Sequence, residues 1–415
     1  MILPIADHFQ YSKREQPFIL PNVVTGHEVI LPMSQMQWLL TQPDHILSQH
    51  EANKQFLRAE YTMLHPSIIG EARMANFINR YLTRDLDIFA KAIVDEIEQA
   101  LEDTWGSDSS KWHEISLYSI MLVIIGRIVN RVLVGLPLCR NPAYLQSSTK
   151  FAQMAPVTGG LISLLPNWLR PALAPFVTAC DTFHYWKMSR MIEPIVRERL
   201  LALGPGVSFK KQVSSQPNDF IQWALVEALS QDEQTERTPA MITKRLAVLG
   251  FAAIQSSTLT ITNALLDIAA SSDSISIQSA LRLEALETAE KSKDNAWTRA
   301  SLAAMAMTDS ALRESLRLWS FVSHGVTKAV VAPNGLTLPS GEHLPYGAKC
   351  GIASYGPHHD NNVYDNPYAF DAFRFCQERK SEVTKGVAKE EHSAPRSFVT
   401  TSDYFMGFSH GRHAW

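Results

Sequence analysis

The spacing of hydrophobic positions predicts helices along most of the chain. Between Met74 and Trp105 an apolar residue recurs every three or four positions, as one buried face of an α-helix requires. We expect this stretch to form one helix or two. The same pattern, interrupted by polar residues 271–276, predicts further helices at Asp219–Ser230, at about Pro239–Ala270, up to about Lys293, and from Ala296 to Phe321.

Two shorter regions have the composition of β-strands. Residues Phe18–Met33 suit a short strand pair. Later strands are predicted at Val326–Val331, Leu336–Pro339 and Lys349–Ser354, separated by Asn-Gly and Ser-Gly turns. The predicted fold is therefore mainly α with a small β-sheet. It has β-rich pieces at about 18–33 and 326–354 and a helical body at about 34–321, in one domain spanning residues 1–415.

One apolar stretch, Ile120–Val134, is long enough to be tested as a membrane span. Arg127, Asn130 and Arg131 interrupt its second half, which is costly in lipid and ordinary in a buried amphipathic helix. The N-terminal stretch MILPIADHFQYSKREQPF lacks the long apolar core of a signal peptide. The chain as given is therefore expected to be soluble and cytoplasmic.

Composition narrows the possible functions. Hydrophobic residues make up 46% of the 415 residues and charged residues 19%, which suits a large core and excludes a disordered chain. Lys and Arg (38) nearly balance Asp and Glu (41), which argues against binding nucleic acid through a basic face. The cysteines are too few and too scattered for a disulfide framework or a zinc pair: Cys139, Cys180, Cys350 and Cys376.

Three segments in the last third carry candidate chemistry. Glu314 and Arg317 are three residues apart on a predicted helix, so they share one face and can form an ion pair. A solvated surface pair is the simplest interpretation, but the apolar residues around them favour burial, which would demand a further partner such as Arg374. The third segment is Phe405–Ala414, with the sequence FMGFSHGRHA.

These three segments, in this order, resemble the cytochrome P450 family. Glu314 and Arg317 match its E-x-x-R motif, Arg374 matches the arginine that completes an E-R-R triad, and Phe408–Ala414 match the loop F-x-x-G-x-R-x-C-x-G up to the cysteine. The resemblance covers nearly the whole chain. Further stretches, such as Asp219–Trp223, look like fungal members that oxidise terpenoid and indole-terpenoid secondary metabolites.

The resemblance implies a haem-thiolate monooxygenase. Such an enzyme holds haem b through a Cys thiolate, receives NADPH-derived electrons through a flavin-containing reductase, and oxidises a lipophilic small molecule. It also implies a monomer. Family members of this type are anchored in the endoplasmic reticulum.

The resemblance assigns cofactor contacts within the loop and on the sheet. Phe408 opens the loop, Gly411 is its fixed glycine, and His413 takes the position of an arginine that contacts a haem propionate. Lys328 matches a basic residue that reaches a propionate, with a solvated strand lysine as the alternative. The thiolate position falls on Trp415, whose indole has no lone pair free for iron, so the sequence assigns no metal ligand there.

Other residues could in principle ligate the iron. Cys350 and Cys376 belong to upstream segments and are expected to be buried, inert thiols. His410 and His413 lie in the loop itself, and imidazole ligates haem readily. A histidine-ligated haem therefore stays open as an alternative.

The distal side is assigned to the stretch Gly250–Thr258, which resembles the family's oxygen-activation motif. Gln255 takes the acid position, and Ser256 and Ser257 take those of two threonines whose hydroxyls would bond dioxygen and relay protons. The alternative is a buried helix whose hydroxyls bond back to the i−4 carbonyl. The substrate cleft is expected to be apolar and lined by Phe251, Ile254, Leu259, Val326 and Val330.

Two hypotheses follow for the whole chain. In the first, it is a P450 monooxygenase truncated at both ends, without membrane anchor and thiolate, and inactive as it stands. In the second, it is a non-catalytic pseudoenzyme or the product of a decayed gene. The transcript beyond the codon for Ala414 would distinguish them.

Overall fold

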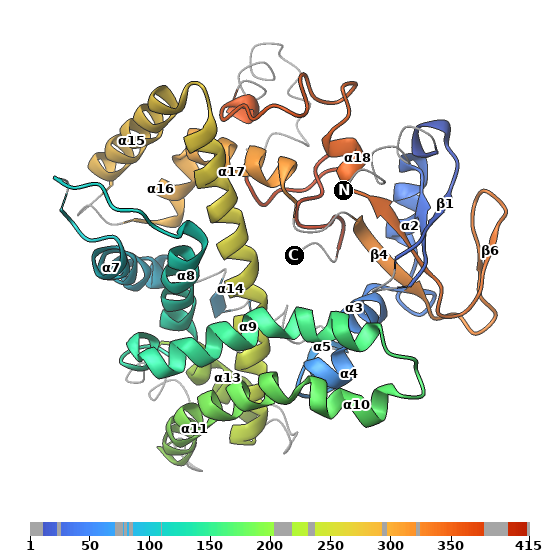
Figure 1. Ribbon diagram of the computed structural model, residues 1–415, viewed down its shortest axis with the longest axis horizontal. Coiled ribbons are helices and arrows are strands. Elements are labelled where there is room, and N and C mark those ends of the chain that lie inside the picture. The colour runs from blue at the N-terminus through green and yellow to red at the C-terminus, as the bar shows by residue number, and fades with distance from the viewer. Residues whose placement is uncertain are drawn as a thin grey trace. The chain divides into compact units, whose positions relative to one another are not determined.

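Figure 1 shows the computed structural model of the chain, which folds as two compact units. Unit 1 comprises Met1–Gln55 and Leu259–Trp415, and unit 2 comprises Phe56–Thr258. The structure describes residues 11–22, 26–70, 78, 81–82, 86–108, 110–202, 218–230, 237–292, 297–320, 324–376 and 397–412.

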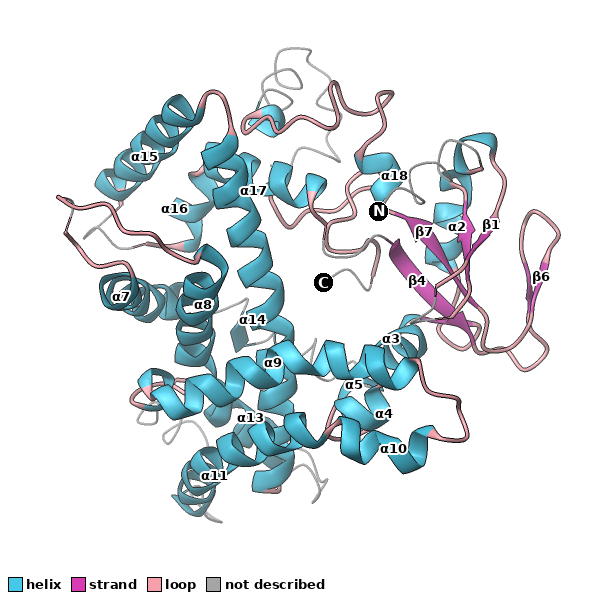
Figure 2. Cartoon of the chain, in the orientation of Figure 1, coloured by secondary structure: helices cyan, strands magenta, loops and turns pink. Residues whose placement is uncertain are grey.

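The described secondary structure of unit 2 consists of helices joined by loops (Figure 2). Helix α8 illustrates why: its buried positions recur every third residue at Met121, Ile124 and Arg127, so one face packs inward. The helices of this unit are α4 (Ala59–Thr62), α5 (Ser67–Gly70), α7 (Leu86–Thr104), α8 (Leu117–Leu133), α9 (Pro142–Ser163), α10 (Arg170–Val177), α11 (Ala179–Ala202), α13 (Phe220–Ser230) and the first part of α14 (Pro239–Ala270).

Helix α8 is a packed helix of unit 2, as its interrupted apolar stretch predicts. Arg127 is buried in it and donates to Glu96 of α7 at 2.6 Å, and Arg140 donates to the same carboxylate at 2.8 Å. Among the described helices, α14 is long and apolar enough to cross a membrane by length and composition. Within unit 2, however, α14 buries Ile242, Leu246 and Ala247 in the main apolar cluster.

Unit 1 contains a five-stranded sheet in the order β1-β2-β7-β4-β3 (Figure 2). Strand β2 pairs with β1 antiparallel and with β7 parallel, so residues from both ends of the chain share one sheet. Both predicted strand regions are confirmed. The strands are β1 (Phe18–Leu20), β2 (Glu28–Leu31), β3 (Leu47–Ser48), β4 (His324–Val330) and β7 (Lys349–Ala353), with a separate pair formed by β5 (Leu336–Thr337) and β6 (His343–Leu344).

The remaining helices of unit 1 include two differences from the sequence prediction. The helix expected from Ala296 to Phe321 is two helices, α16 (Arg299–Ala304) and α17 (Ala306–Leu318). Met305 leaves the helical region (φ −78°, ψ 70°), and the carboxylate of Glu284 then accepts from the first amides of α17. Helix α15 (Ser274–Lys291) begins inside the predicted break at residues 271–276. The other helices are α2 (Met36–Thr41), α3 (Gln49–Leu57) and α18 (Tyr355–His358).

Candidate functional site

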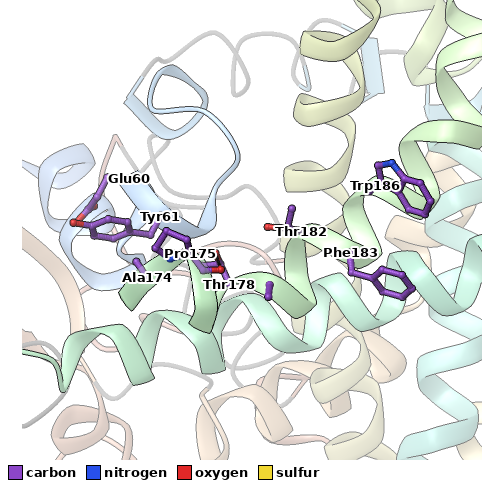
Figure 3. A pocket seen from close by; sticks show the side chains of 9 residues that line it. Glu60, Tyr61, Ala174, Pro175, Thr178, Thr182, Phe183 and Trp186 are labelled. Carbon is purple, nitrogen blue, oxygen red and sulfur yellow. Dashed lines mark hydrogen bonds between the residues drawn. The ribbon is translucent and has the colours of Figure 1, made fainter. Parts of the chain in front are cut away.

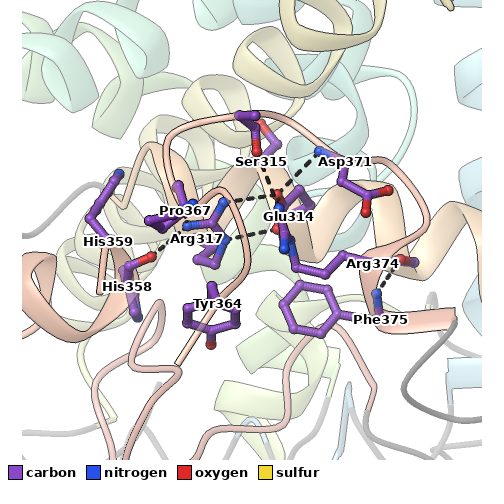
Figure 4. Close-up of polar contacts among 12 residues, drawn as sticks. Glu314, Ser315, Arg317, His358, His359, Tyr364, Pro367, Asp371, Arg374 and Phe375 are labelled. Atoms are coloured by element: carbon purple, nitrogen blue, oxygen red, sulfur yellow. Dashed lines mark hydrogen bonds and ion pairs between the residues drawn. The ribbon is translucent and has the colours of Figure 1, made fainter. Parts of the chain in front are cut away.

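A buried carboxylate on α17 joins two arginines in unit 1 (Figure 4). Glu314 accepts from Arg317 Nε and Nη2, both at 2.8 Å, and from Arg374 Nε at 3.0 Å. The side chains of Glu314 and Arg317 are fully buried. The alternative of a solvated surface pair is therefore wrong. A buried pair of this kind costs desolvation energy that only several well-placed donors offset, and here they are present.

The same three residues fasten α17 to the segment that follows the sheet. Arg317 Nη1 donates to the carbonyls of His358 and of Pro367, the latter at 2.7 Å. Arg374 Nη1 donates to the Asp365 carbonyl at 2.7 Å. The remaining guanidinium donors of the two arginines thus bind backbone carbonyls and fix the path of residues 358–374.

The residues Tyr404–Arg412 form what we call the Phe408 loop. Gly411 has a positive φ of 82°, and a Cβ there would lie 2.5 Å from Leu40 Cδ2. Ser409 also has a positive φ, of 65°, which lies in the left-handed region that favours glycine. Its hydroxyl accepts from Val326 N at 3.1 Å, an amide that a bulge in β4 turns out of the strand ladder.

Lys328 lies beside the Phe408 loop, and the solvated alternative for it is wrong. It is 1% exposed, and its Nζ donates to the carbonyls of Leu39 at 2.8 Å and Gln42 at 3.4 Å. Burial and the nearby Arg412 both lower the pKa of its ammonium group. Arg412 itself donates to Gln42 O at 3.1 Å and to Asp44 at 2.7 Å.

Of these two cations, Lys328 is the one suited to a haem propionate. Its buried ammonium is held by neutral carbonyls and would favour an added carboxylate, whereas Arg412 already pairs with Asp44. The axial side does not fit within the described residues. His410 has its Nδ1 at 2.9 Å from Thr401 Oγ1 and its Nε2 at 3.3 Å from Asp403, so both ring nitrogens are engaged.

The two upstream cysteines considered as iron ligands, Cys350 and Cys376, differ in burial. Cys350 is buried, which raises the pKa of its thiol to about 12. Cys376 is only partly buried, contrary to the prediction, and donates to the Ala306 carbonyl at 3.1 Å. The described residues contain no cluster of three or more His, Cys, Asp or Glu that could hold a metal ion. His413 and Trp415 lie outside the described residues, so the propionate contact and the thiolate position remain predictions.

The distal stretch lies on α14 within unit 2. Ser256 Oγ donates to the Ala252 carbonyl at 2.8 Å, which is the back-bonded geometry of the alternative interpretation. Gln255 Nε2 donates to the hydroxyl of Tyr118 at 2.9 Å, whereas Ser257 is exposed. The structure therefore turns Gln255 toward α8, and the roles of these three residues remain predictions.

The profile of the cytochrome P450 family matches residues 70–414 of the sequence. The chain belongs to the cytochrome P450 family. It is 30% identical to the cytochrome P450 monooxygenase htyF of Aspergillus rugulosus, over 98% of this chain and 60% of that protein. It is also 28% identical to the monooxygenases pbrC of Penicillium brasilianum and astC of Aspergillus terreus, over 97% of this chain and 74% and 75% of those proteins. Membership in the P450 family implies a haem cofactor.

The apolar substrate cleft remains a prediction, because the cavity described in unit 2 is a different site. Val326 and Val330 are buried in the cluster that packs on the sheet of unit 1, and Ile254 is buried in unit 2. Unit 2 has an open cavity of about 630 Å³ (Figure 3), which none of the five predicted residues lines. It is lined by Glu60, Tyr61, Ala174, Pro175, Thr178, Ala179, Thr182, Phe183 and Trp186.

Sequence reasoning missed two residues of this P450 that touch the Phe408 loop. The guanidinium of Arg313 lies 3.6 Å from the ring centroid of Phe405, and His358 Nε2 accepts from Met406 N at 2.9 Å. Arg313 directly precedes Glu314 of the E-x-x-R motif, so its position was a usable signal. His358 is the last residue of α18, a four-residue helix too short for periodicity to mark a buried side chain.

Proposed function

We propose that the complete protein is a haem-dependent P450 monooxygenase that oxidises a hydrophobic secondary metabolite of the terpenoid or indole-terpenoid class. The observation that carries the proposal is the buried Glu314 held between Arg317 and Arg374 beside the Phe408 loop. The fungal relatives named above support the class of enzyme. Because this chain spans about 60% of the length of htyF, the activity of the whole protein is itself part of the proposal. The family match runs across both units and supports treating them as one P450-type domain.

Residues of the chain would divide the work around the cofactor. Phe408 and Gly411 would shape the loop against the haem, and Lys328 and His413 would neutralise its propionates. When bound, the haem supplies the chemistry of oxygen activation. Ser256 would offer a hydroxyl for proton relay, once released from the Ala252 carbonyl, with Ser257 as a second hydroxyl. Gln255 cannot relay a proton as a carboxylic acid does, so its role would be to orient this turn of α14.

The proposal also includes the partners and the location. Electrons would come from NADPH through a flavin-containing reductase, and the substrate would be a lipophilic small molecule bound by a monomer. The complete protein would be anchored in the endoplasmic reticulum, as other members of this type are. We do not expect the protein to bind nucleic acid, because its positive and negative charges are nearly balanced.

We further propose that the 415-residue chain does not turn over substrate. Trp415 falls at the thiolate position of the loop motif, and its indole cannot ligate iron. The second candidate function, a non-catalytic pseudoenzyme, rests on this same residue. It would apply if the gene encodes Trp415 and then stops.

A carbonmonoxy difference spectrum tests the proposal. We expect the haem-loaded 415-residue chain to lack the thiolate-type spectrum and the Trp415→Cys variant to gain it. A variant that also carries Glu314→Gln should bind less haem. If Trp415→Cys binds haem without a thiolate-type spectrum, or binds none, the loop assignment is refuted. Sequencing the transcript downstream of Ala414 then separates the two functions, because a frame that continues with Cys supports the enzyme and a stop supports the pseudoenzyme.

A further inference from the structure

We infer that His358 is a positioning residue that connects the E-R-R triad to the Phe408 loop through its own backbone and side chain. The inference rests on the proposed function in one respect, the assignment of this loop to the haem. Its geometry stands independently. Arg317 donates to the carbonyl of His358, and the imidazole of the same residue accepts from the amide of Met406 at 2.9 Å (Figure 4 shows the triad side).

The imidazole is held as a neutral acceptor. His358 is completely buried, and its ring stacks on Phe405 with a centroid distance of 5.6 Å and an interplanar angle of 27°. Burial, followed by the charges of Arg317 and His359, lowers the pKa of His358 to about 3. Because Nε2 accepts from Met406, the proton of the neutral ring sits on Nδ1.

A second path runs through Tyr364. The guanidinium of Arg317 lies 4.9 Å from the centroid of the Tyr364 ring, and the Tyr364 hydroxyl donates to the Tyr404 carbonyl at 2.9 Å. Arg313 covers the ring of Phe405 between these two contacts. Three consecutive residues, 404 to 406, therefore each contact at least one side chain from the triad region.

This arrangement explains how the triad can act on a loop that it does not bond directly. In the described part of the chain, the hydrogen bonds of Glu314, Arg317 and Arg374 join them to one another and to residues 358–371. His358 lies at the start of that segment and reaches the base of the Phe408 loop. Because its carbonyl bonds Arg317 and its imidazole bonds the Met406 amide, His358 couples the backbone of residues 358–371 to that of the Phe408 loop.

Hydrogen exchange of the 415-residue chain without haem tests the inference. His358→Phe keeps a buried ring against Phe405 and removes the acceptor, so exchange of the amides in residues 404–409 should become about tenfold faster. Exchange within α17 should not change. The matched control is His359→Phe, because His359 is a buried neighbour whose Nδ1 bonds the Tyr355 carbonyl inside α18. His358→Gln places an amide oxygen near the lost acceptor and should restore much of the protection.

Tyr364→Phe keeps the experiment decisive if His358→Phe fails to fold, because it removes only a hydroxyl. It should speed exchange around residue 404 by a few-fold. Unchanged loop exchange in both variants, or an equal increase in His359→Phe or in α17, would overturn the inference. Haem titration is a separate readout. Its failure in the Trp415→Cys chain would refute the proposed function and leave the exchange result standing.

Discussion

The buried carboxylate of Glu314 gives the sharpest test of how this P450 is held together. It accepts four hydrogen bonds, from Arg317 Nε and Nη2, Arg374 Nε and the Asp371 amide at 3.2 Å. Glu314→Gln keeps the shape, removes the charge, and turns an NH₂ group toward guanidinium donors. The completely buried Arg317 then lacks its counter-ion. Removing one partner of a buried ion pair costs about 3–5 kcal/mol, so we expect a loss of that size in the free energy of unfolding.

Urea denaturation monitored by circular dichroism measures this loss. The control is Glu287→Gln, which removes an exposed helical pair with Lys291 at 3.4 Å and should change the free energy of unfolding by no more than about 0.5 kcal/mol. If Glu314→Gln costs less than about 1 kcal/mol, the triad is not the buried, charge-dependent anchor described above, and the argument from burial to stability fails.

Three further substitutions test other features, each followed by denaturation. Gly411→Ala should destabilise more than Gly341→Ala, because both have positive φ but only at Gly411 does a Cβ meet a neighbour, Leu40 at 2.5 Å; equal losses would contradict the close packing of the Phe408 loop. Burial lowers the pKa of Lys328 in the folded state, so its contribution to stability should grow as pH rises from that lowered pKa toward 10.5. The difference in the free energy of unfolding between wild type and Lys328→Met should increase over this pH range. A difference that does not change with pH would argue against a buried ammonium. Burial raises the pKa of Asp181 from 3.8 to about 6, so the free-energy cost of burying its ionised carboxylate appears as pH rises through that interval. Asp181→Asn should therefore stabilise by up to about 3 kcal/mol at pH 7 and show almost no gain at pH 3, and an equal gain at both would rule out this cause.

Much of the fold could be predicted because helical periodicity and strand composition are local signals. The bounds of α14 match the prediction at both ends, whereas the break at Met305 went unseen. No Gly or Pro marks that break. It depends on the carboxylate of Glu284, which comes from another helix.

The candidate site also combines features that the local sequence predicts with features that depend on distant segments. A spacing of three residues predicts that Glu314 and Arg317 can pair, because a helix fixes that geometry. The burial of Lys328 and the part played by His358 depend on segments far away in sequence, at residues 39–42 and 406. The bulge of β4 at Val326 is a further feature that a strand pattern does not reveal.

The parallel pairing of β2 with β7 has a consequence for how the protein is made. Glu28 and Lys349, which form a buried ion pair across these strands, are 321 residues apart in sequence. At roughly 5–20 residues per second on the ribosome, β2 waits for some tens of seconds before its partner emerges. Meanwhile the open edge of the β1–β2 hairpin can pair with other nascent chains. The five-stranded sheet can therefore close only after translation has passed residue 353.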